Sequence, residues 1–234
     1  MKALIRRLRP DPYFVAGVLA VVVIGAVYRV QASPARAGEL PVSTISSEFI
    51  RGLDLLGAGR TQGSADAPVK VIELFDYQCP ACAAAHEAVW PSVARLIERG
   101  AVQYTAYDLP LPGHANAIPA SVVANCVAER VPEHFAEVRR RLFATQAAWS
   151  EAYPAEPALL EVVAAAGADS AAVRECAGAT GSSRAAVYRK TWEAARTAGV
   201  TFTPAWAVNG KVVKWADLEA EVEAAVRRAG SAAE

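Results

Sequence analysis

The stretch FDYQCPACAAAHE, residues 75–87, holds two cysteines, Cys79 and Cys82, with two residues between them. Such a pair can be a structural disulfide, half of a metal site or a redox couple. A structural zinc site needs a second pair of ligands nearby, and the other cysteines, Cys126 and Cys176, stand alone. His86 keeps a copper or zinc role open. A structural disulfide over so short a loop gains little stability, so we favour the redox interpretation.

The two cysteines fall where a predicted strand gives way to a predicted helix. The run VKVIELF, residues 69–75, is short, apolar and β-branched, and predicts a buried strand. The apolar spacing of residues 81–99 predicts a helix with a kink at Pro91. The first N–H groups of a helix have no partner and carry partial positive charge, which stabilises a thiolate. We therefore predict Cys79 as the exposed nucleophile and Cys82 as the buried resolving thiol.

Glu73 interrupts the apolar strand six residues before Cys79. Acidic residues are rarely buried without a partner or a task. One interpretation is a solvent-facing carboxylate on an edge strand. The other is a buried acid that relays protons to or from Cys82. Asp76, nearer the end of the strand, is predicted to be a surface or cap residue.

The remaining chain predicts an α/β fold. The run GAVQYTAYDL, residues 100–109, predicts a turn and a second strand parallel to the first. Residues 116–199 are helical in character, and their segment EVRRRLF is predicted to be a solvated helix face. Asn209-Gly210 lies between two short apolar runs and predicts a hairpin, which a helix over about residues 215–229 follows. The order is β-α-β, a helical block, then β-β-α, and His114 is predicted in the loop that leads into the block.

The N-terminus predicts export. Residues 1–30 combine a basic start with an uncharged apolar run, which is typical of a signal anchor or of a signal peptide cut before Gly38. Residues 31–61 are predicted to be a linker, within which residues 48–56 are predicted to form a short helix. The positive-inside rule then places the rest of the chain outside the cytoplasm, where disulfide chemistry is favoured. Lys+Arg and Asp+Glu are equal at 24 each, so nucleic-acid binding has no electrostatic support.

Two separated segments, ADAPVKVIELFDYQCPACAAAHE and GVTFTPAWAVNG, resemble the signatures of the DsbA-like branch of the thioredoxin superfamily. The resemblance covers about residues 62–230. It implies a thioredoxin-like domain over residues 62–115 and 200–234, with residues 116–199 as an inserted helical domain. It also implies site residues: Cys79 and Cys82 as the attacking and resolving cysteines, Thr203 as a backbone contact for the substrate, Pro204 as a cis-proline, and Glu73 as the family's buried acid.

Cys126 and Cys176 fall on separate helices of the predicted block. They can be two buried free thiols, because free cysteine packs as a small hydrophobe. They can also form one structural disulfide across a long loop, which export favours and which some relatives in the family also have. A second redox pair is the third interpretation.

These observations predict an exported, membrane-anchored thiol-disulfide oxidoreductase of the cell envelope that introduces disulfides into exported proteins. Cleavage of the N-terminus would instead leave a secreted or periplasmic protein. The resemblance implies no cofactor or metal, and a quinone-linked membrane reoxidase of the DsbB or VKOR type as partner. Pro80-Ala81 lacks the histidine of the family's strongest oxidants, so we predict a moderate oxidant. A reductase or isomerase, for example in cytochrome maturation, and a non-catalytic peptide- or copper-binding module are the alternatives.

Overall fold

The computed structural model describes residues 42–57 and 59–231. In this part of the chain, five strands form one mixed sheet in the order β1-β3-β2-β4-β5. Their bounds are β1 Gly59–Gln62, β2 Val69–Phe75, β3 Val102–Asp108, β4 Ala205–Val208 and β5 Lys211–Val213. The central pair, β2 and β3, is parallel as predicted, and the other neighbours are antiparallel.

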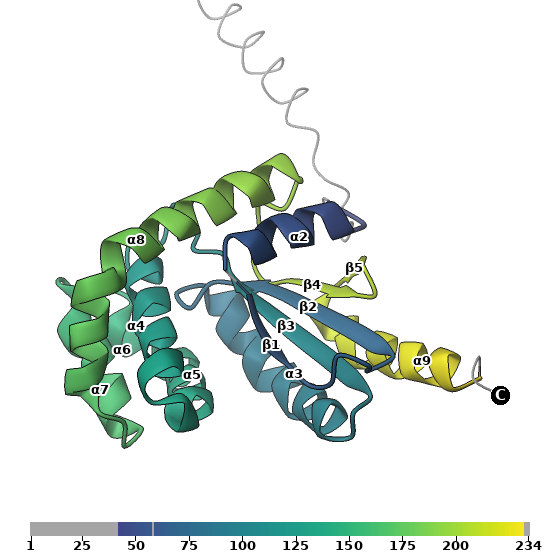
Figure 1. Ribbon diagram of the computed structural model, residues 1–234, viewed down its shortest axis with the longest axis horizontal. Helices are drawn as coiled ribbons and strands as arrows, with labels where there is room; N and C mark the ends of the chain where they lie inside the picture. Colours follow the sequence, from purple (N-terminus) through teal and green to yellow (C-terminus); the bar gives the residue numbers. More distant parts are fainter. Residues whose placement is uncertain (1–41, 58, 232–234) are drawn as a thin grey trace, which may run out of the picture. The chain divides into compact units, whose positions relative to one another are not determined.

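Helices cover both faces of the sheet (Figure 1). Helices α3, Pro80–Glu98, and α9, Leu218–Ser231, pack on one face. Helix α2, Ser47–Leu55, and the C-terminal part of α8, Ser170–Thr197, pack on the other. The alternation of side chains along β2 directs Glu73 and Phe75 to the α3 face and Leu74 to the α2 face.

The helical block lies between β3 and β4 in the sequence. Its elements are α4 Ala117–Arg130, η1 Pro132–His134, α5 Phe135–Ala144, α6 Gln146–Trp149, α7 Ala155–Ala165 and α8. Helix α8 belongs to both halves of the molecule. Its beginning packs against α4, whereas Ala195, near its end, joins the core on the α2 face of the sheet. The helical block predicted over residues 116–199 therefore shares its last helix with the sheet.

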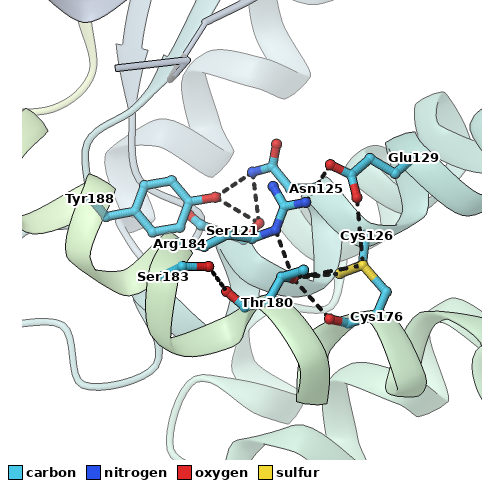
Figure 2. Close-up of a disulfide and its surroundings, with 9 residues drawn as sticks. All are labelled: Ser121, Asn125, Cys126, Glu129, Cys176, Thr180, Ser183, Arg184 and Tyr188. Carbon is cyan, nitrogen blue, oxygen red and sulfur yellow. Dashed lines mark hydrogen bonds and ion pairs between the residues drawn. A yellow bond between two sulfur atoms is a disulfide. The ribbon is translucent and has the colours of Figure 1, made fainter.

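A disulfide between Cys126 and Cys176 joins α4 to α8, with an S–S distance of 2.04 Å (Figure 2). Both cysteines are fully buried. Next to the bridge, the Thr180 hydroxyl donates to the backbone carbonyl of Cys176 at 2.8 Å, and Arg184 pairs with Glu129 of α4. Of the interpretations that the sequence left open, the structure shows this pairing rather than two free thiols.

The short helix predicted within the linker over residues 31–61 is confirmed, whereas the loop predicted after it is wrong at residues 59–62. Residues 47–55 form α2, which buries Phe49 and Leu53, and residues 59–62 form β1, which pairs with β3. The sequence of β1, GRTQ, is polar because it is an exposed edge strand, so it lacks the apolar pattern that signals a strand. Gly59 fits there because a Cβ atom would lie 2.6 Å from the ring of Tyr107.

The C-terminal hairpin is confirmed. Asn209 and Gly210 have φ of 49° and 84°, and they connect β4 to β5. These left-handed values match the twist of a two-residue hairpin turn and explain the Asn-Gly sequence. Residues 215–217 form the short helix η2, and α9 follows it.

The predicted signal segment, residues 1–30, lies outside the described residues. Among residues 42–57 and 59–231, no helix combines the length and apolar character needed to cross a bilayer.

Candidate active site

The two redox-candidate cysteines occupy the first turn of α3. Cys79 is the N-cap residue, Pro80 is the first helical residue, and both cysteines are free thiols. A proline fits there because its missing N–H would have had no partner. Cys82 is fully buried, as predicted. Cys79 is 6% exposed, which is less than the sequence predicted, because the segment that carries Thr203 covers its sulfur.

The environments of the two thiols push their pKa values apart. The thiol of Cys82 donates to the sulfur of Cys79, and backbone N–H groups of Cys82 and Ala81 add to this effect. These donors outweigh partial burial and lower the pKa of Cys79 to about 6. Burial raises the pKa of Cys82 well above its ordinary value. At neutral pH Cys79 is thus the thiolate and Cys82 its hydrogen-bond donor, which is the division of roles that thiol-disulfide exchange requires.

The segment before β4 lies against the sulfur of Cys79. The peptide bond between Thr203 and Pro204 is cis, and the carbonyl oxygen of Thr203 lies 3.5 Å from Cys79 Sγ. Both residues are partly exposed. The structure thus brings together two motifs that are 124 residues apart in the sequence.

Glu73 is fully buried, which excludes the solvent-facing interpretation. Its carboxylate accepts hydrogen bonds from the hydroxyl of Tyr104 and from Nη2 of Arg139, the latter at 2.8 Å. Burial raises the pKa of Glu73, and Arg139 opposes this shift. None of its hydrogen bonds in the described residues goes to a cysteine. Proton relay by Glu73 therefore stays a prediction.

Arg139 corrects the prediction that EVRRRLF is a solvated face. Arg139 is 3% exposed, and its guanidinium lies 5.0 Å from the ring centroids of both Phe75 and Trp90. Successive helical residues point about 100° apart, so Arg140 faces solvent while Arg139 faces Glu73. Glu73, a single acidic residue within an apolar strand, was the feature of the sequence that indicated a buried cationic partner.

Of the two roles predicted for Asp76, surface or cap residue, the surface role is wrong, because Asp76 is fully buried. One carboxylate oxygen accepts from the backbone N–H of Gln78 at 2.7 Å. The other accepts from the N–H of Leu111 at 2.8 Å and lies 2.6 Å from Nδ1 of His114. The backbone N–H of Asp76 points to Cys82 Sγ at 3.5 Å. Burial raises the pKa of Asp76 against these hydrogen bonds.

Amide side chains fasten the cysteine loop to the helical block. Gln146 donates to the carbonyl oxygens of Tyr77 and Cys79, at 2.7 and 3.1 Å. The backbone N–H of Asn116 donates to Oε1 of Gln78 at 2.7 Å. The side-chain amide of Asn116 donates to the carbonyls of Trp149, Ser150 and Ala152. Sequence analysis missed these residues because single amides at the ends of helices carry no periodic signal.

His86, which had kept a metal role open, packs among aromatic rings. It stacks on Trp90 at 5.5 Å between ring centroids and contacts Phe143 at 4.7 Å. Burial, with Arg139 and Arg140 nearby, lowers the pKa of His86 to about 3. Over residues 42–57 and 59–231, no three His, Cys, Asp or Glu side chains are grouped so that they could hold a metal ion.

A protein-family model described as Thioredoxin matches residues 56–228. Disulfide bond formation protein D of Bacillus subtilis is 28% identical to this chain over 85 residues, which are 36% of this chain and 38% of that relative. The aligned part is thus well under half the length of that relative.

Several solved structures share the fold. BdbD from Bacillus subtilis superposes with a TM-score of 0.63 at 20% identity, over 81% of this chain and all of the other. DsbA from Mycobacterium tuberculosis has a TM-score of 0.55 at 21% identity, over 76% of this chain and all of the other. MdbA from Corynebacterium diphtheriae has a TM-score of 0.59 at 20% identity, over 80% of this chain and 94% of the other.

Proposed function

Because this chain belongs to the thioredoxin family, we propose that it is an exported protein-disulfide oxidoreductase that introduces disulfides into exported proteins through Cys79 and Cys82. The observation that carries the proposal is the asymmetry of the two thiols. Cys79 is stabilised as a thiolate at the start of α3, and Cys82 is buried and protonated behind it. A stabilised thiolate favours the reduced form of the protein, and this makes the corresponding disulfide oxidising.

The reaction begins with the oxidised protein. A substrate thiolate attacks Cys79 Sγ, the bond to Cys82 breaks, and a mixed disulfide forms. A second substrate thiolate then attacks the substrate sulfur of this mixed disulfide, and Cys79 leaves as a thiolate. The substrate gains a disulfide, and the protein takes up two electrons.

Thr203 and Pro204 are the proposed substrate-binding residues. The Thr203 carbonyl oxygen lies beside the reacting sulfur, where it can accept a hydrogen bond from the backbone N–H of an extended peptide. When a peptide adds to an exposed backbone edge in this way, main-chain hydrogen bonds, which every sequence can form, supply the affinity. This suits a protein with many exported, cysteine-containing substrates.

Turnover requires reoxidation of Cys79 and Cys82. The proposed partner is a quinone-linked membrane reoxidase of the DsbB or VKOR type. The predicted anchor over residues 1–30 would keep the domain close to such a partner and raise its effective concentration. Disulfide bond formation protein D, the Bacillus subtilis relative, bears a name consistent with this direction of electron flow.

Two measurements test the function. The equilibrium of Cys79 and Cys82 with glutathione should give a potential well above that of thioredoxin, about −270 mV; a value at or below it would contradict the oxidase role. A Cys82→Ala variant expressed in cells should accumulate mixed disulfides with exported proteins. The matched Cys79→Ala variant should accumulate none, because it lacks the attacked sulfur.

A further inference from the structure

The short helix α6 of the helical block lies against the cysteine loop, residues 76–79. Trp149 in α6 is fully buried, and its indole N–H donates to the carbonyl oxygen of Leu142 in α5 at 2.9 Å. Directly after α6, the carbonyl oxygen of Ser150 accepts from the side chain of Gln78 at 2.8 Å. These contacts hold α6 in place beside the cysteine loop, and Gln146 is its first residue.

Gln146 joins two carbonyl groups of the cysteine loop. Its Nε2 atom donates to the carbonyl oxygen of Tyr77 at 2.7 Å and to that of Cys79 at 3.1 Å. The Tyr77 oxygen accepts from no other donor in the part of the chain that the structure describes. The Cys79 oxygen also accepts from the N–H groups of Cys82 and Ala83, at 3.0 and 3.2 Å. Among the described residues, Gln146 is thus the one side chain that donates to the backbone of Cys79.

The carbonyl group of Cys79 belongs to the same residue as the reacting sulfur. Its carbon is bonded to Cα, and the sulfur is bonded to the neighbouring Cβ. A carbonyl oxygen carries partial negative charge, which disfavours a thiolate nearby, and a hydrogen bond donated to that oxygen weakens this repulsion. The disulfide carries no charge. The amide of Gln146 should therefore stabilise the reduced protein more than the oxidised protein.

We propose that Gln146 is a positioning residue that makes the disulfide between Cys79 and Cys82 more oxidising, because its amide holds the carbonyl groups of Tyr77 and Cys79. Gln146 acts through the backbone and not on the sulfur itself. The helical block then helps to set the redox equilibrium of a site at the start of α3. This inference rests on the proposed function only in taking the two cysteines as a redox pair.

The alternative is a purely structural role for Gln146. Loss of its amide leaves the carbonyl of the buried Tyr77 without a donor, which destabilises the folded protein in either redox state. A purely structural role lowers the stability of both forms equally and leaves the redox equilibrium unchanged. The proposed role lowers the stability of the reduced form more.

The first test is the redox equilibrium of the full-length protein with glutathione at neutral pH. Gln146→Met removes the donor and keeps a side chain of similar length. The net contribution of an ordinary hydrogen bond corresponds to about a 5-fold change in an equilibrium constant. Gln146→Met should therefore shift the equilibrium about 5-fold toward the disulfide, which lowers the potential by about 20 mV. The ultraviolet titration of the Cys79 thiolate should move to higher pH.

The second test compares the stability of the two redox forms by urea denaturation. Gln146→Met should lower the free energy of unfolding of the reduced protein more than that of the oxidised protein. The substitution leaves the redox equilibrium of the unfolded chain unchanged. The difference between the two losses must therefore equal the shift measured with glutathione, because the two measurements close one thermodynamic cycle.

Two further variants make the comparison specific. Thr145→Val, at the neighbouring position, removes a hydroxyl that donates to the carbonyl of Arg141 at 2.8 Å, and it should leave the glutathione equilibrium unchanged. Gln146→Asn keeps an amide on a side chain one methylene shorter, and it should behave as Gln146→Met does.

The inference is overturned if both Gln146 variants lose equal stability in the two redox forms and keep the wild-type equilibrium, or if Thr145→Val shifts that equilibrium as much. Failure of the proposed oxidase function would appear separately, as a wild-type potential at or below that of thioredoxin, because the present test measures only differences between variants and the wild type.

Discussion

Glu73 of β2 and Arg139 of α5 are 66 residues apart in the sequence, yet their side chains meet at 2.8 Å in a pair that is 0% and 4% exposed. The pair connects β2 of the sheet to α5 of the helical block. An intact buried pair contributes little net stability, but removal of one partner leaves an uncompensated charge in the core.

Arg139→Met should therefore lower the free energy of unfolding at neutral pH by about 3–5 kcal/mol, measured by urea denaturation. Burial already raises the pKa of Glu73, and loss of Arg139 raises it further. A carboxyl group with a raised folded-state pKa favours folding while protonated, and its contribution is lost as pH rises above the unfolded value of about 4.3. The loss in free energy of unfolding caused by Arg139→Met should thus be smaller at acid pH. Arg140→Met, at an exposed position, should change stability by less than about 0.5 kcal/mol; equal losses in both variants would refute the argument.

The Cys79 thiolate should make the stability of the reduced protein depend on pH. Its pKa is about 6 in the folded state, against about 8.5 for an unfolded cysteine. A depressed pKa contributes stability that is complete above the unfolded value and disappears as pH falls through the folded one. The reduced protein should therefore gain stability between about pH 6 and pH 8.5, and the oxidised protein should not.

Thiolate absorbance in the ultraviolet checks the same assignment. The reduced protein should titrate near pH 6, and Cys79→Ser should abolish this transition. Cys82→Ala should raise the pKa of Cys79, because the Cys82 thiol is its strongest stabilising donor. A transition that survives in Cys79→Ser would assign the thiolate to another residue.

Asn116 should prove to be a structural clamp for the cysteine loop. Asn116→Ala removes one donor from each of three carbonyl groups, those of Trp149, Ser150 and Ala152. The first two keep the N–H of Ala152 and Nε2 of Gln78 as donors, whereas the Ala152 carbonyl keeps none in the described residues. An acceptor left unpaired costs about 1–3 kcal/mol, and amide hydrogen exchange should accelerate over residues 146–154. Gln103→Ala, at a half-buried site whose side chain makes no hydrogen bond in the described residues, is the control. Unchanged exchange in Asn116→Ala would exclude a clamping role.

The second cysteine pair should stabilise the protein without taking part in exchange. Replacing Cys126 and Cys176 together by alanine opens a link across 50 residues, for which chain entropy predicts a loss of about 4 kcal/mol. The pKa of Cys79 should stay unchanged in this variant. An altered Cys79 titration, with stability retained, would instead favour a redox role for the second pair.

The sequence predicted those parts of the fold that have a periodic apolar pattern or a short local motif. The parallel strands, the Asn209-Gly210 hairpin and the helix that begins at the cysteines are of this kind. It failed at β1, whose residues are polar because they lie at an edge, and at Arg139, whose direction depends on how α5 packs. A surface role was open for Asp76 in the sequence because its partners, among them His114, come from a loop that only the folded chain brings near.

The helix α8 has a consequence for how this protein can be cut or recombined. It leaves the helical block, yet its last turns supply Ala195 to the core that covers Leu74 and Tyr107 of the sheet. Excising residues 116–199 as a module would remove the contribution of α8 to that cover, while α2 stays, and would expose part of the apolar sheet face to water. The helical block therefore cannot be removed without affecting the core of the sheet. A minimal redox domain engineered from this chain would have to keep the end of α8 or replace it with another helix.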